Sequence, residues 1–186
     1  DLNRKNMRRN IMKRLFRFLL TTLFVCAITT CFAACNSSQY EYGEIIYKYD
    51  ANSNSYIVAG YWGKSIEAVI LDEYDDGTNG LHSVTSIARS AFRYCKYLKS
   101  ITIPDSVTSI CERAFFDCYS LVNINVNENN PNYKSIDGNL YGKDGKTLIQ
   151  YAIGKSATAF VIPDNVTNIG NYAFNDCSKL TNVTIP

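Results

Sequence analysis

The apolar positions in the second half of the chain recur in one register. Three segments carry Val, Ile, Ala-Phe, Cys and Leu at matching places: 84–105 (VTSIARSAFRYCKYLKSITIPD), 107–126 (VTSICERAFFDCYSLVNINV) and 166–186 (VTNIGNYAFNDCSKLTNVTIP). The step from Phe92 to Phe115 is 23 residues, and Phe174 aligns with both. Self-similarity at a fixed period predicts a repeat solenoid, in which each unit is too small to fold alone and buries its apolar face against its neighbours.

Each unit predicts one strand and a compact return. Leu98, Ile101 and Ile103 form an L-x-x-I-x-I pattern, and alternation along a strand sends both isoleucines to the interior. Pro104 ends the strand. The later Ala-Phe-x-x-Cys segment predicts a short helical or 3₁₀ turn with its apolar side chains inward.

One unit is enlarged. The step between the second and third copies is 59 residues, which leaves a unit of 36 residues. This enlarged repeat is at 127–164, and its extra material lies between Asn127 and Thr158. Its β-prone runs, Tyr133–Tyr141 and Lys146–Ile153, flank the turn Gly142–Gly145 and predict a β-hairpin. We expect this hairpin to protrude from the solenoid.

Residues 36–80 predict an N-terminal cap. Glu44–Tyr49 and Tyr56–Tyr61 resemble strands, and the polar turn between them indicates a hairpin. Terminal repeats need a modified outer surface, and the tyrosines of this stretch are suited to covering the first repeat. Ile66–Leu71 is expected to form a degenerate first strand of the repeat sheet. The repeat domain itself spans 81–186.

Residues 1–35 predict a bacterial export signal. Lys13, Arg14 and Arg17 precede the apolar run 18–28, and Phe-Ala-Ala-Cys ends at Cys35, whose thiol is the expected site of lipidation. The alternative is an uncleaved membrane anchor over 18–34; both place the remainder outside the cytoplasm. Because the chain starts with Asp and stops inside a repeat, we expect it to be incomplete at both ends.

Charge bears on the class of partner. Beyond residue 34 the chain holds 12 basic and 16 acidic residues, a net charge of −4. Binding to a phosphate backbone needs clustered Lys and Arg. A nucleic acid partner is therefore not expected.

The string I-P-D-S-V-T-S-I-x-x-x-A-F-x-x-C-x-x-L over 103–121 closely resembles the BspA-like leucine-rich repeat. The resemblance covers 81–186 and implies a right-handed leucine-rich-repeat β/3₁₀-α solenoid exposed at the cell surface. Members are generally regarded as adhesins for host matrix proteins, mucosal surfaces or other cells. Ala88 and Cys111 stand where the family usually has Gly, as at Gly170.

The outward positions of the repeat strands are the candidate ligand-binding face, because solenoids present extended binding surfaces. The alternative is that small polar residues only keep a sheet soluble. The residues of this face are Ser100, Thr102, Asn123, Asn125, Val161, Asn182 and Thr184.

Two other groups have structural interpretations. Cys95, Cys118 and Cys177 align in a column that predicts buried free thiols, with a Cys95–Cys118 disulfide or a metal site as alternatives. The acidic loop 72–77 predicts a solvated capping loop in preference to a calcium site, because its spacing differs from that of an EF-hand. We expect no metal and no cofactor.

Catalysis has little support in the sequence. His82 is the single histidine, it has no evident partner, and no Gly-rich phosphate loop is present. We therefore expect a lipid-anchored surface protein that is not an enzyme and binds an extracellular protein or glycan. The alternatives are a self-associating envelope protein and the substrate-binding module of a larger surface enzyme.

Overall fold

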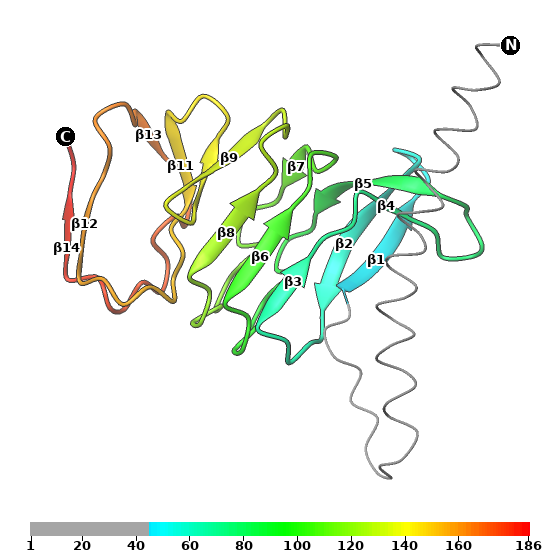
Figure 1. Cartoon of the computed structure of the whole chain (residues 1–186), viewed down its shortest axis with the longest axis horizontal. Helices are drawn as coiled ribbons and strands as arrows, with labels where there is room; N and C mark the ends of the chain where they lie inside the picture. The colour runs from blue at the N-terminus through cyan, green and yellow to red at the C-terminus, as the bar shows by residue number, and fades with distance from the viewer. Residues whose placement is uncertain (1–44) are drawn as a thin grey trace, which may run out of the picture. The chain divides into compact units, whose positions relative to one another are not determined.

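Short strands joined by turns make up residues 45–186, which the computed structural model describes (Figure 1). This range contains fourteen strands and no helix. The strands are β1 (Ile45–Asp50), β2 (Ser55–Tyr61), β3 (Glu67–Val69), β4 (Glu73–Tyr74), β5 (His82–Ile87), β6 (Ser100–Ile103), β7 (Ser109–Ile110), β8 (Asn123–Val126), β9 (Tyr133–Ile136), β10 (Asn139–Gly142), β11 (Thr147–Gln150), β12 (Ala159–Val161), β13 (Asn168–Ile169) and β14 (Asn182–Thr184).

The described part of the chain begins with an antiparallel hairpin, as the sequence predicts for these two strands. β1 pairs with β2, with Asp50 opposite Ser55 at the turn end. β2 then pairs in parallel with β5, and β5 pairs in parallel with β7, so the hairpin is continuous with the first repeats. β4 adds to β5 in antiparallel orientation.

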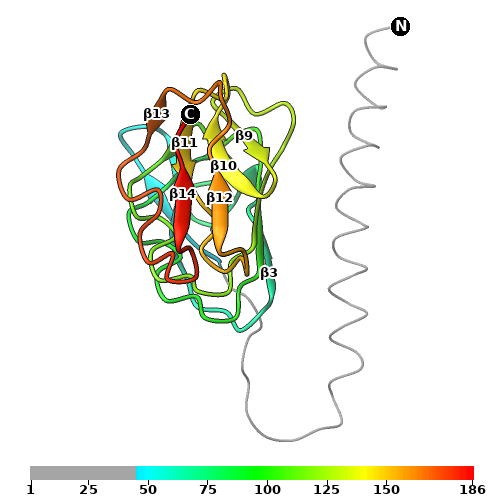
Figure 2. The ribbon, with the colours of Figure 1, turned by 90° about the vertical axis from the view of Figure 1, so that its left-hand side faces the viewer.

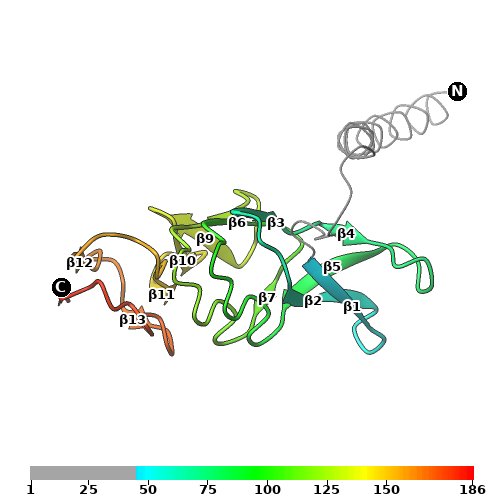
Figure 3. The ribbon, with the colours of Figure 1, turned by 90° about the horizontal axis from the view of Figure 1, so that it is seen from below.

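A second parallel ladder consists of β3, β6 and β8. Ala68 lies opposite Ile101, and Ile101 lies opposite Ile124, so equivalent residues of successive units stack in one row. The prediction of a first strand within Ile66–Leu71 is confirmed, because β3 pairs with β6. Figure 3 shows β3 and β6 along one side of the structure and β2 and β7 along the other.

Tight turns replace the short helical segment expected in each unit. Backbone bonds join residues three apart, as from the Arg93 amide to the Ser90 carbonyl (3.0 Å). In three of these turns, non-glycine residues with positive φ stand at two equivalent positions, and left-handed backbone cannot continue a right-handed helix. These residues are Ser90, Arg113 and Tyr172 at the first position and Tyr94, Asp117 and Asp176 at the second.

The predicted hairpin of the enlarged unit is present, because β10 pairs antiparallel with β11 across the turn at 142–145. It is integrated into the body, so the prediction that it protrudes is wrong. β10 lies between β9 and β11, and β11 pairs in parallel with β13. Leu140 and Leu148 are fully buried. The physical reason is that these leucines fill the core rows that the enlarged unit would otherwise leave empty.

Aromatic rings stack along the interior. The ring centres of Phe92 and Phe115 are 5.6 Å apart, and those of Tyr151 and Phe174 are 5.7 Å apart. Tyr151 occupies the Phe position of the enlarged unit, because its amide binds the Ala173 carbonyl as the Phe92 amide binds that of Ala114. Phe92 and Phe115 are buried, whereas Phe174 is half-buried. Figure 2 shows β12 and β14 side by side in the last unit.

Candidate binding surfaces

Four of the seven residues predicted for the ligand-binding face lie together on β6 and β8. Ser100 is opposite Asn123 and Thr102 is opposite Asn125, while the intervening Ile101 is fully buried. The Asn125 amide nitrogen (Nδ2) donates to the Ser100 hydroxyl oxygen (Oγ) at 3.0 Å. The expected alternation of polar and buried positions is therefore present on these two strands.

The other three predicted residues lie on a separate two-stranded sheet. β12 pairs with β14, which places Val161 opposite Thr184 and Asn182 opposite Ala159. The enlarged unit lies between the two sheets in sequence, and its Gly138 carbonyl accepts the Ile124 amide of β8 at 2.8 Å. The predicted continuous face is thus divided into two patches.

The first patch has an apolar margin that the sequence analysis did not include. Val69 of β3 lies opposite Thr102 and is 63% exposed. Ile66 and Leu71 flank the same strand and are also exposed. The alternation in Glu67-Ala68-Val69, with Ala68 buried, could have identified Val69 as an outward residue. We call β3, β6 and β8 with these outward side chains the sheet face.

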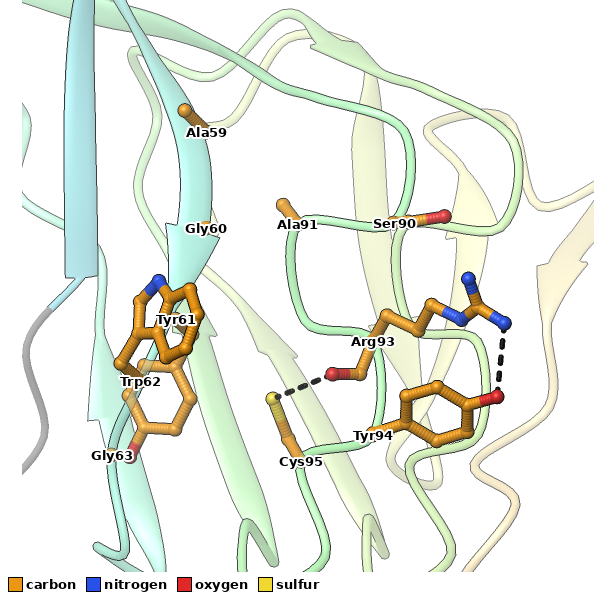
Figure 4. Close-up of a pocket in the computed structure, with 10 residues that line it drawn as sticks. All are labelled: Ala59, Gly60, Tyr61, Trp62, Gly63, Ser90, Ala91, Arg93, Tyr94 and Cys95. Carbon is orange, nitrogen blue, oxygen red and sulfur yellow. Dashed lines mark hydrogen bonds between the residues drawn. The ribbon is translucent and has the colours of Figure 1, made fainter.

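We call residues 90–95, the turn of the first repeat unit, the first turn. Beside it lies an open pocket of about 500 Å³ that the sequence analysis missed (Figure 4). One wall is the end of β2 and the residues after it, 59–63. The other wall is the first turn, with Ser90, Ala91, Arg93, Tyr94 and Cys95.

The side chains of Trp62 and Arg93, which both line this pocket, are exposed to solvent. Trp62 is 77% exposed. The Arg93 guanidinium lies 4.5 Å from the centre of the Tyr94 ring and donates to the Tyr94 hydroxyl at 2.9 Å. The sequence holds one signal for this pocket: Trp62 is the single tryptophan and lies in the segment Gly60-Tyr61-Trp62-Gly63.

The predicted cysteine column has two buried members and one half-buried member. Cys95, Cys118 and Cys177 are all unpaired thiols. The Cys118 sulfur lies 2.7 Å from the Phe92 carbonyl. Two causes raise the pKa of Cys118: a hydrogen bond with the Cys95 thiol, which has the larger effect, and burial. Burial and the nearby Asp176 carboxylate raise the pKa of Cys177 to about 11. The thiols of Cys118 and Cys177 are therefore protonated at neutral pH.

The backbone at the three positions where the family usually has Gly takes part in the hydrogen bonds that join successive units. The amides of Ala88, Cys111 and Gly170 donate to carbonyls of the preceding unit at 2.9, 2.9 and 2.8 Å. None of the three has a positive φ, so a side chain causes no backbone strain there.

The acidic loop, residues 72–77, is held by hydrogen bonds between Asp76 and the residues directly after the loop. The Asp76 carboxylate accepts the amides of Thr78 and Asn79 and the Asn79 side-chain nitrogen, and these bonds lower the pKa of Asp76. Within residues 45–186, no three His, Cys, Asp or Glu side chains converge as a metal site would require. Cys35 lies outside the described residues. No segment of the described range forms a helix with the length and apolarity needed to cross a bilayer.

Comparison with solved structures reveals similar repeat proteins. A leucine-rich repeat protein from Eubacterium ventriosum is 34% identical over 55% of this chain and 27% of its own length, with a TM-score of 0.51. One from Bacteroides ovatus is 24% identical over 80% of this chain and 42% of its own, also with a TM-score of 0.51, and shows the fold alone. The chain thus spans less than half the length of either protein.

No curated protein matches the chain. The family described as the BspA type leucine rich repeat region matches residues 79–144 and 150–186, in six copies. The match covers more than half of the sequence and coincides with the stacked units of the structure. The chain belongs to the BspA-type leucine-rich repeat family.

Proposed function

We propose that this protein is a non-catalytic binding protein of the bacterial cell surface, attached through a lipid on Cys35, which holds an extracellular protein or glycan on the sheet face. The observation that carries the proposal is the register of Ser100 and Thr102 with Asn123 and Asn125 over buried isoleucines. Hydroxyl and amide groups repeat there at the spacing of parallel strands, about 4.8 Å.

The chemistry of the sheet face suits many weak contacts. The side chains of Ser, Thr and Asn supply both donors and acceptors, and the groups are neutral. The exposed Val69 and Ile66 at the margin add apolar area beside the polar rows. A ligand with closely spaced polar groups, such as an extended polypeptide or an oligosaccharide, matches this arrangement.

The test compares two charge insertions in the full chain. Thr102→Lys with Asn125→Lys places two cations on the sheet face, and Asn168→Lys places one on the exposed strand β13, in the sheet of β9, β10 and β11. Each is assayed against immobilised extracellular matrix proteins, mucins and a glycan array. At least one ligand should bind the parent chain and the control, and the double variant should bind it about tenfold more weakly, which corresponds to about 1.4 kcal/mol.

Two outcomes would contradict the proposal. If the double variant and the Asn168→Lys control bind alike, the ligand uses another surface. If the parent binds nothing and instead sediments as larger species with rising concentration, the protein associates with copies of itself.

A further inference from the structure

The pocket between β2 and the first turn stands where the turn of a preceding unit would stack. Between the first two turns, the Phe92 amide donates to the Ala114 carbonyl at 2.9 Å and the Tyr94 amide donates to the Phe116 carbonyl at 3.1 Å. The second turn therefore offers two carbonyls, two residues apart, to two amides of the first turn.

The first turn has the same two carbonyls, on Ala91 and Arg93. Among the residues that the structure describes, no backbone amide donates to either of them. The Cys95 thiol donates to the Arg93 carbonyl oxygen, with a sulfur–oxygen distance of 4.0 Å. The end of β2 pairs with β1, with Tyr61 opposite Ile45, and supplies no matching turn. The pocket is thus the position of a missing turn (Figure 4).

The side chains around these carbonyls define what fits. Tyr61 already fills the inner ring position, with its ring centre 5.5 Å from that of Phe92. An occupant therefore lies on the outside, against the exposed indole of Trp62. The Arg93 guanidinium is the one charged group among the lining residues, and it attracts a carboxylate.

We propose that this pocket binds a turn of an acidic peptide segment of a partner protein. Two amides of the peptide, two residues apart, donate to the carbonyls of Ala91 and Arg93, and a peptide carboxylate pairs with the Arg93 guanidinium. The spacing favours a polypeptide over a sugar, because polypeptide amides fill the equivalent acceptor pair one unit further on. This site is separate from the sheet face and extends the proposed function by a second contact.

Trp62, as the single tryptophan, reports directly on the pocket. The probe is the capped peptide SAFEYS, which copies the first turn (SAFRYC) with Glu in place of Arg and Ser in place of Cys. Titration into the full chain should shift the tryptophan emission in a saturable manner. A second peptide, methylated on the phenylalanine and tyrosine amides, lacks both donors and should leave the emission unchanged.

A charge exchange tests the role of Arg93. The variant Arg93→Glu should bind SAFEYS about tenfold more weakly and recover affinity for SAFKYS. Recovery also shows that the variant is folded. The control Arg89→Glu changes an exposed arginine outside the pocket and should bind SAFEYS like the parent. The sheet-face variant with Thr102→Lys and Asn125→Lys should also bind it normally, so the two proposals can fail independently.

Three results would overturn the pocket proposal: an unchanged emission with SAFEYS, equal binding of the methylated peptide, or no recovery with SAFKYS. A shift with chitohexaose or maltohexaose in the absence of any shift with SAFEYS would assign the pocket to a glycan and also reject the peptide.

Discussion

The guanidinium of Arg113 lies 3.9 Å from the centre of the Tyr172 ring, although these residues belong to units that are not consecutive in sequence. Glu112 and Asn171 make a hydrogen bond of 2.7 Å beside them, across 59 residues of chain. The cause is the short return of the enlarged unit: Leu148 pairs with Ile169, but Tyr151 follows Leu148 by three residues, whereas Phe174 follows Ile169 by five. The two flanking turns therefore meet over it.

Loss of this contact should lower stability measurably. Tyr172→Ala removes the cation–π pair and should reduce the free energy of unfolding by about 0.5–2 kcal/mol. Urea denaturation of the single and double variants with Arg113→Ala should give a coupling energy of about 0.5–1 kcal/mol. Tyr97→Ala, an exposed tyrosine on the first turn, is the control and should change little. A coupling near zero would mean that the pair contributes nothing in solution.

The aromatic row should be the most sensitive part of the core. Phe115→Ala removes a buried ring that stacks on Phe92 and should cost about 3–5 kcal/mol. The neighbouring Phe116 is half-buried and contacts Arg93 and Arg113 outside the core, so Phe116→Ala should cost clearly less. Thermal unfolding of both variants decides the order. Equal losses would show that the two phenylalanines are not divided between core and surface in solution.

The described cysteines should differ in reactivity. Cys111 is exposed, whereas Cys95 and Cys118 are buried, so iodoacetamide should modify Cys111 first in the folded chain. Cys177 should react only as the pH approaches about 11, where its thiolate forms. Under denaturing, non-reducing conditions all four should be alkylated, as mass spectrometry can show. If Cys95 and Cys118 stay unmodified together, they form a disulfide.

The same thiols link stability to alkaline pH. The folded state raises the pKa of Cys118 and Cys177 above the ordinary value of 9.0, so the folded chain binds more protons than the unfolded chain above that pH. The contribution is complete below about pH 9 and is lost as the pH rises toward 11. Cys177→Ala should flatten this decline in urea titrations at increasing pH. An unchanged slope would assign the decline to other groups.

The proposed lipid attachment can be tested at the Cys35 sulfur. If the Cys35 thiol is acylated, the chain expressed in a bacterial host should incorporate a clickable palmitate analogue and sediment with membranes. Cys35→Ser should abolish the label and release the protein from the membrane fraction. Membrane association that persists in the unlabelled variant would indicate a retained anchor over 18–34.

The sequence predicts the repeat, the paired hairpin strands and the polar positions of β6 and β8, because each depends on local alternation and on a period of 23 residues. The burial of Leu140 and Leu148 depends on rows set by distant units, which no local pattern reveals. The positive-φ positions hold Ser, Arg and Tyr in one case and Tyr and Asp in the other, so residue type gives no signal for them. The pocket results from a missing turn, which has no motif.

The bond between the Ile124 amide and the Gly138 carbonyl interrupts the outward strand surface between β8 and β12. The two patches belong to separate sheets, so residues in one can be substituted without disturbing the strand pairing of the other. A ligand long enough to touch both gains by tethering, because its second contact forms at a high effective concentration. Avidity within a single chain would then depend on the span of the ligand, so a short fragment of the natural partner would lose far more affinity than its lost contacts alone explain.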